Sequence, residues 1–169
     1  GRTGAAVTAH PIATNAAMNA FERGGNAVDA TVAAALALGV VDGFNSGIGG
    51  GCFMLIRKPN GSFVAIDGRE TAPLKADRDM YLRDGKAKPE LSRTGALAIG
   101  VPGALAAYDL AIRQHGNIDL AEHLGQAATV AEQGFALDDA YLSRLGQVVK
   151  KLRKFPGSGR IFLNAEGNA

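Results

Sequence analysis

A glycine-packed turn followed by two short apolar runs constrains the fold of this 169-residue chain most strongly. Glycines stand at position 47 and at positions 49–51, directly before the apolar run 52–57. Glycine loses more backbone freedom on folding than any other residue, so a segment this rich in glycine needs unusual backbone angles or the close approach of another group. We therefore expect either a tight loop packed under a helix or one edge of a functional site.

The two apolar runs predict a β-hairpin. Residues 52–57 and 62–67 are joined by Pro59-Asn60-Gly61, a strong turn signal between two runs of strand length. In both runs, apolar side chains occupy both of the alternating faces, which is typical of strands that are covered on both sides. We therefore expect this hairpin to lie inside a layered structure.

Apolar residues at helical spacing predict five helices around the hairpin, and together these elements indicate an α+β fold. Asn26 is a good N-cap for the second helix, with Asp29 in its first turn. Only twelve uncharged residues separate Asp29 from Asp42, and a membrane span needs about 20, so we expect a buried core helix and no membrane span. The expected helices cover about 13–23, 27–41, 102–115, 119–133 and 139–152, with inward apolar faces. Residues 74–100 look irregular, and the tail from Pro156 is glycine-rich with one short apolar piece at 161–163.

Composition and spacing argue against several classes of function. The formal net charge of +2 is too small to indicate nucleic acid as a partner. The glycine turn lacks the lysine and hydroxyl of a phosphate loop, and it opens a strand instead of a helix, so no nucleotide cofactor is expected. The three histidines and Cys52 show no metal-ligand spacing, so no metal is expected. We interpret Cys52 as a small buried hydrophobe.

A charged cluster at the end of the second apolar run is the strongest candidate site. Arg69 stands between the carboxylates Asp67 and Glu70 in the segment Asp67–Pro73. A guanidinium group presents a rigid fork of donors that suits a carboxylate partner. Two interpretations stay open at this point. Arg69 forms an internal salt bridge with Asp67 or Glu70, which local sequence alone favours, or it contacts a ligand.

Four motifs in one order resemble the large subunit of the gamma-glutamyltranspeptidase family. The resemblance extends over nearly the whole chain and through the segments around Gly116 and Gly134. The motifs are Gly24-Gly25-Asn26-Ala27-Val28-Asp29-Ala30, Ser46-Gly47-Ile48-Gly49-Gly50-Gly51, Asp67-Gly68-Arg69-Glu70-Thr71-Ala72-Pro73 and Gly100-Val101-Pro102-Gly103.

This resemblance implies a fold and a subunit organisation. Family members are N-terminal nucleophile hydrolases with a four-layer αββα sandwich, made as one precursor that cuts itself into a large and a small subunit. Residues 1–169 are then the N-terminal portion of the large subunit, incomplete without the rest of it and the small subunit. The nucleophile is the N-terminal threonine of the small subunit, so no catalytic residue is expected in this chain.

The resemblance also reverses the interpretation of Arg69. The family arginine at this position binds the α-carboxylate of the γ-glutamyl group, so Arg69 is expected to bind substrate, with Asp67 and Glu70 as supporting residues. The implied reaction passes a γ-glutamyl group from a glutathione-like substrate to water or an amino acid, without a cofactor. A cephalosporin-acylase-like amidase of the same fold and a non-catalytic structural fragment are the alternatives. Many bacterial members are exported, so a periplasmic or secreted location is expected, with the cytoplasm as the alternative.

Overall fold

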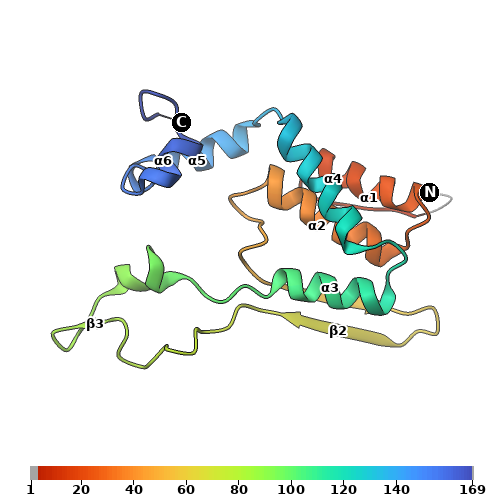
Figure 1. The fold of residues 1–169 in the computed structure, drawn as a ribbon, viewed down its shortest axis with the longest axis horizontal. Helices are drawn as coiled ribbons and strands as arrows, with labels where there is room; N and C mark the ends of the chain where they lie inside the picture. Colours follow the sequence, from red (N-terminus) through yellow and green to blue (C-terminus); the bar gives the residue numbers. More distant parts are fainter. Residues whose placement is uncertain (1–3, 169) are drawn as a thin grey trace.

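Helix α2 lies at the centre of the fold, with α1 and α4 packed beside it and α3 between these helices and a β-hairpin (Figure 1). The structure, a computed structural model, describes residues 4–168. The helices and strands in chain order are α1 (Pro11–Glu22), α2 (Ala27–Val41), β1 (Cys52–Arg57), β2 (Phe63–Gly68), β3 (Leu82–Arg83), β4 (Lys86–Ala87), α3 (Ala104–His115), α4 (Leu120–Gln133), α5 (Asp139–Leu152) and α6 (Pro156–Phe162), with two 3-10 turns at Pro89–Ser92 and Ala96–Ala98.

Two small apolar clusters fix the central helix. Val32 and Leu36 face α3 and the hairpin, where they join the larger cluster. Ala30, Ala33 and Ala34 pack against alanines of α1, because short side chains allow two helix backbones to approach closely. The predicted α2 is therefore confirmed as a buried core helix. Among the described residues, no helix is both long and apolar enough to cross a membrane.

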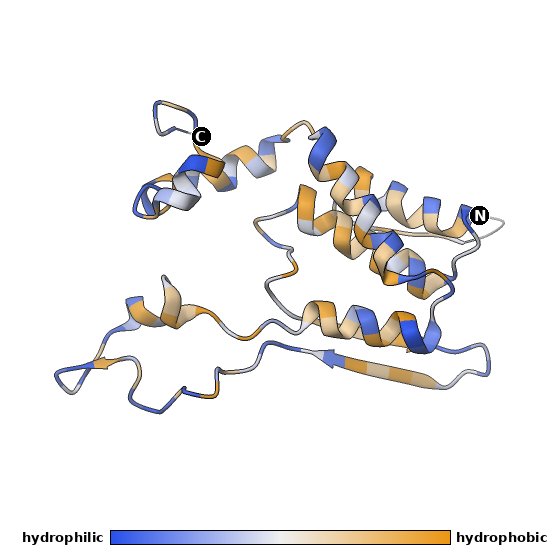
Figure 2. Ribbon diagram, viewed as in Figure 1, coloured by the Kyte–Doolittle hydropathy of each residue, from blue (hydrophilic) through white to orange (hydrophobic). Residues whose placement is uncertain are grey.

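The predicted hairpin is confirmed, but only one of its faces is covered. β1 and β2 pair antiparallel, and Met54 opposite Ile66 is buried against α3. The opposite face remains open, because Phe53, Leu55 and Phe63 are 72%, 71% and 61% exposed. Figure 2 shows this apolar character along β2. The expectation of cover on both sides is therefore wrong for the part of the chain that the structure describes, where helices pack on the inner face alone.

A buried carboxylate joins α2 to the turn before α4. Asp29 is fully buried and accepts hydrogen bonds from the backbone N–H groups of Asn26 (2.8 Å), Asn117 (3.0 Å) and Ile118 (2.9 Å). The ring Nε2 of His123, also buried, lies 3.4 Å from the same carboxylate. The bond to Asn26 completes a capping box at the start of α2. One side chain thus closes a helix start and holds two distant segments together.

The C-terminal half departs most from expectation. The predicted inward face of α4 holds only at Leu120, which packs against the larger cluster, since Leu124 is exposed and His123 is the buried residue of that helix. The predicted inward face of α5 has no fully buried residue within the described chain. The glycine-rich tail from Pro156 carries no helix prediction, yet Pro156–Phe162 forms α6, with the proline at its first turn. Residues 74–100 form a long excursion away from the helices, carrying the short β3–β4 ribbon (Figure 1).

Candidate functional site

Three glycine-containing segments meet where β2 ends and α3 begins. The carbonyl of Gly50 accepts hydrogen bonds from the backbone N–H groups of Gly103 and Ala104, both at 3.1 Å, and so caps the first turn of α3. A Cβ added to Gly51 would lie 2.6 Å from the carbonyl oxygen of Gly68, and one added to Gly68 would lie 2.6 Å from the Cβ of Ala107. Side chains are therefore excluded here because the three backbones touch.

Arg69 is the first residue after this junction, and its side chain points outward. The last pair of the β1–β2 ladder joins Cys52 and Gly68, so Arg69 has left the strand. Its side chain is 69% exposed, and its Nε lies 3.5 Å from Oε2 of Glu70. An exposed pair of this kind contributes about 0–1 kcal/mol. The structure gives the two Nη atoms no hydrogen bond or ion pair with any residue that it describes, so the outer edge of the fork is open.

The two neighbouring carboxylates have different roles. Oδ1 of Asp67 accepts a hydrogen bond from the backbone N–H of Arg69 at 2.9 Å and makes no ion pair with the guanidinium. Glu70 is half-buried and turns toward the glycine turn, where its Oε2 lies 2.8 Å from the position that a Cβ of Gly51 would take. The internal salt bridge predicted from local sequence therefore exists with Glu70 alone, as a single contact.

A second backbone contact holds the segment after Glu70. Thr71 and Val101 form an isolated antiparallel bridge, with N–H to O distances of 3.2 and 2.8 Å. This bridge closes the base of the excursion that follows, because it ties the start of that excursion to its end. Arg69 and Glu70 therefore stand between two fixed points, the glycine junction and the bridge.

A cavity of about 530 Å³ lies beside the glycine turn, and Glu70 forms part of its wall. Cys52 and Tyr108 also line it, and burial raises the pKa of the Cys52 thiol. The pKa of Tyr108 is also raised, first by burial and then by the nearby thiolate of Cys52. Both groups are therefore protonated near neutral pH. Cys52 was predicted to be a small buried hydrophobe, and the structure finds it only half-buried. Among the described residues, no three metal-ligating side chains cluster together.

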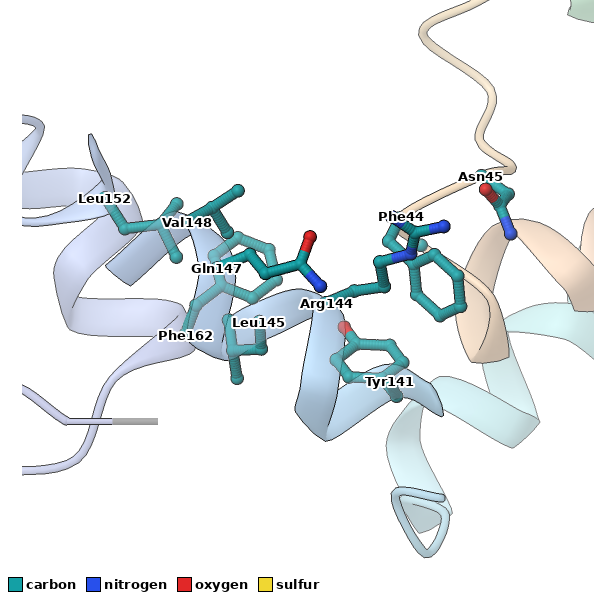
Figure 3. A pocket seen from close by; sticks show the side chains of 10 residues that line it. Phe44, Asn45, Tyr141, Arg144, Leu145, Gln147, Val148, Leu152 and Phe162 are labelled. Atoms are coloured by element: carbon teal, nitrogen blue, oxygen red, sulfur yellow. The ribbon is translucent and has the colours of Figure 1, made fainter. Parts of the chain in front are cut away.

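A second hollow lies far along the chain, between α5, α6 and the loop after α2. It has a volume of about 510 Å³, and its lining is mostly apolar. Figure 3 shows Phe44 beside Tyr141, and Phe162 of α6 beside Leu145 of α5. The ring centroids of Phe44 and Tyr141 are 5.6 Å apart, and the rings meet at 84°. This hollow shares Gly43, Phe44 and Asn45 with the cavity beside the glycine turn, but Asp67, Arg69 and Glu70 do not line it. The sequence offered one signal for it, the apolar stripe of α5, which we had expected to be buried.

Comparison with solved structures defines the class of protein. The chain superposes on the gamma-glutamyltranspeptidase of Helicobacter pylori with a TM-score of 0.94 and 36% identity, covering 98% of this chain and 48% of that one. The fold is therefore the α+β fold of the N-terminal nucleophile hydrolases, as the sequence predicted. The sequence model described as gamma-glutamyltranspeptidase matches residues 13–169, and the chain belongs to that family.

Curated relatives agree with this assignment. A glutathione hydrolase proenzyme from Pseudomonas sp. (strain A14) is 39% identical over 163 residues, which are 95% of this chain and 28% of the relative. The acylase ACY 1 proenzyme from Pseudomonas sp. (strain V22) is 38% identical over 170 residues, which are 96% of this chain and 30% of that relative. The chain thus spans less than a third of the length of these two curated relatives.

Proposed function

We propose that the chain is the N-terminal part of the large subunit of an enzyme that hydrolyses or transfers γ-glutamyl groups. The observation that carries the proposal is the open guanidinium of Arg69, whose Nη atoms lack a partner among the described residues while its backbone is held by Asp67. Two parallel N–H groups match a carboxylate in a bidentate pair. Arg69 binds the α-carboxylate of the γ-glutamyl substrate in this proposal.

The nucleophile comes from a partner subunit in this proposal. The N-terminal threonine of the small subunit attacks the γ-glutamyl amide carbon, and its own α-amino group accepts the hydroxyl proton. A γ-glutamyl ester forms as the C–N bond breaks, and the amine leaves with that proton. Water or an amino acid then attacks the ester and restores the threonine. The word proenzyme in the names of both curated relatives agrees with such processing.

The open face of the hairpin supports a missing partner. Phe53, Leu55 and Phe63 together expose an apolar surface that is costly in water, at roughly 25 cal/mol for each Å² left uncovered. Within residues 4–168, the outer edge of β1 also pairs with no strand, so a further strand can add there. In this proposal the rest of the precursor, including the small subunit, covers this face.

Replacing Arg69 tests the proposal. Arg69→Ala in the intact, processed enzyme is expected to cost about 2–4 kcal/mol of substrate binding, or roughly 30- to 1,000-fold in KM for a γ-glutamyl anilide. Arg69→Lys keeps the positive charge but loses the paired N–H donors of the guanidinium, so its KM is expected to lie between those of the unmodified enzyme and Arg69→Ala. The matched substrate is the anilide of 4-aminobutanoic acid, which lacks the α-carboxylate. Unchanged kinetics of Arg69→Ala with the γ-glutamyl anilide would contradict the role of Arg69.

An acylase that accepts amides without an α-carboxylate is the second candidate, and the likeness to the acylase ACY 1 proenzyme favours it. The same pair of anilides separates the two functions. A γ-glutamyl enzyme prefers the substrate with the α-carboxylate and loses that preference in Arg69→Ala. An acylase of broad specificity cleaves both anilides at similar rates, with or without Arg69. A non-catalytic fragment cleaves neither, even with its full precursor present.

A further inference from the structure

The hydrogen bond between Asp67 and Arg69 restrains the backbone at the point where the chain leaves β2. Oδ1 of Asp67 accepts the N–H of Arg69, two residues further on, at 2.9 Å. This is the geometry of an Asx turn, in which a short side chain takes the place of a backbone acceptor. The ladder with β1 has ended at Gly68, so β1 supplies no acceptor for this N–H.

Helix α3 restrains the same backbone from the other side. A Cβ on Gly103 would lie 2.8 Å from the carbonyl oxygen of Arg69, and one on Gly68 would lie 2.6 Å from the Cβ of Ala107. The Gly68–Arg69 peptide therefore has α3 behind it and the Asp67 carboxylate on its N–H. Among the described residues, the side chain of Arg69 makes no hydrogen bond and one long ion pair, from its Nε to Glu70 at 3.5 Å. The direction of the guanidinium thus depends more on its backbone than on its own contacts.

We propose that Asp67 is a positioning residue, whose side-chain oxygen sets the direction in which Arg69 leaves the strand and thereby the affinity for the substrate carboxylate. This inference rests on the proposed function. It requires a hydrogen-bond acceptor at position 67 and does not require a charge, because Asp67 bonds to a backbone N–H and leaves the guanidinium free. An asparagine side chain supplies the same acceptor in an Asx turn, so Asp67→Asn keeps the restraint.

Asp67→Ala and Asp67→Asn separate the role of the hydrogen-bond acceptor from the role of the negative charge. Asp67→Ala removes the acceptor, so Arg69 loses a restraint and binds the carboxylate less well. Asp67→Asn keeps the oxygen and removes a negative charge near the substrate carboxylate, which relieves repulsion between like charges. Asp67→Asn is therefore expected to bind the γ-glutamyl substrate as well as the unmodified enzyme, or slightly better.

Asp77 offers a matched control. Its Oδ1 accepts the N–H of Asp79 at 2.8 Å, which is the same two-residue turn on an exposed part of the excursion. Asp77→Ala removes the same bond and the same charge without touching the Gly68–Arg69 peptide. Any general effect of losing one exposed aspartate therefore appears in Asp77→Ala as well.

The experiment measures KM and kcat of the intact, processed enzyme for the γ-glutamyl anilide and for the anilide of 4-aminobutanoic acid. KM does not depend on the fraction of precursor that has been processed. Asp67→Ala is expected to raise KM for the γ-glutamyl anilide about fivefold to tenfold, in line with the loss of one hydrogen bond. The kcat of Asp67→Ala, and its kinetics with the substrate that lacks the carboxylate, are expected to stay within about twofold of the unmodified enzyme. The KM values of Asp67→Asn and Asp77→Ala for the γ-glutamyl anilide are expected to stay within the same range.

Two results overturn the positioning role. The first is an Asp67→Ala enzyme whose KM for the γ-glutamyl anilide is unchanged. The second is an Asp67→Asn enzyme whose KM is raised as much as that of Asp67→Ala, because the effect would then come from the lost charge. Arg69→Ala, measured beside them, separates this inference from the proposed function. If Arg69→Ala loses the preference for the α-carboxylate while Asp67→Ala keeps it, only the positioning role fails. If Arg69→Ala keeps that preference, the proposed function itself fails.

Discussion

The buried carboxylate of Asp29 gives the sharpest prediction for the stability of this fold. Asp29→Ala removes the acceptor of three backbone N–H groups, those of Asn26, Asn117 and Ile118. The bond to Ile118 is buried, and the other two are partly buried. An unsatisfied buried donor costs about 1–3 kcal/mol. The largest cost is therefore expected at Ile118, with smaller costs where water can reach the other two groups.

The sum is about 4 kcal/mol, taking about 2 kcal/mol for Ile118 and about 1 kcal/mol for each of the others. This loss is a large share of the roughly 5–15 kcal/mol that typically stabilises a folded domain. Asp29→Asn keeps one acceptor oxygen but places an amide group where the other oxygen was, so about 2 kcal/mol is expected. His123 loses its carboxylate partner in Asp29→Ala, which adds to the cost.

Urea unfolding followed by helical circular dichroism measures these losses in the intact protein, and amide hydrogen exchange at Asn117 and Ile118 reports them locally. Asp42→Ala is the matched control, since Asp42 is also buried and lies at the other end of α2. Its carboxylate accepts only from the side chains of Asn45 and Ser46 among the described residues, and these can turn to water. An Asp29→Ala cost no greater than that of Asp42→Ala would refute this reasoning.

Acid adds an independent test of the same group. Burial alone raises the pKa of Asp29, but the N–H groups of Asn26, Ile118 and Asn117 and the ring of His123 outweigh it, so the net pKa lies below its usual value. A carboxyl group with a lowered pKa stabilises the folded state above its ordinary pKa, and that contribution is lost as the pH falls through the folded-state pKa. Asp29→Asn is therefore expected to flatten the acid limb of a plot of stability against pH.

Three further changes have expected outcomes. Gly103→Ala places a methyl group 2.8 Å from the carbonyl oxygen of Arg69, so we expect a loss of about 1–3 kcal/mol of stability, measured by thermal unfolding, and a raised KM. An unchanged melting temperature would contradict the close contact. Because burial raises the pKa of Cys52, alkylation by iodoacetamide is expected to reach its half-maximal rate at a higher pH than for free cysteine. Phe53→Ser with Phe63→Ser is expected to make residues 1–169 expressed alone more soluble and to weaken their association with the rest of the proposed precursor in a pull-down. Equal association would place the proposed partner elsewhere on the surface.

Local chemistry made the helices and the hairpin predictable. Asn26 and Asp29 form the capping box that starts α2, and the Pro59-Asn60-Gly61 turn sets the pairing of β1 with β2. These signals act within a few residues and need no distant partner. The resemblance then supplied the family, which the comparisons confirm.

Apart from the missed helix α6, the errors concern surfaces that a sequence pattern cannot assign to a partner. An apolar stripe predicts that a face will be covered, but not that the covering element belongs to the same stretch of chain. α5 and the outer face of the hairpin have such stripes and stay open among the described residues. At the candidate site, spacing alone could not show that Asp67 bonds to the backbone of Arg69 and Glu70 to its side chain.

A crystal structure of the intact enzyme with a slowly cleaved γ-glutamyl ligand tests the central claim most directly. Both Nη atoms of Arg69 are expected within about 2.7–3.0 Å of the two oxygens of the ligand α-carboxylate, with Asp67 still bonded to the backbone N–H. A ligand carboxylate bound by other groups, with Arg69 still directed toward Glu70 alone, would contradict it.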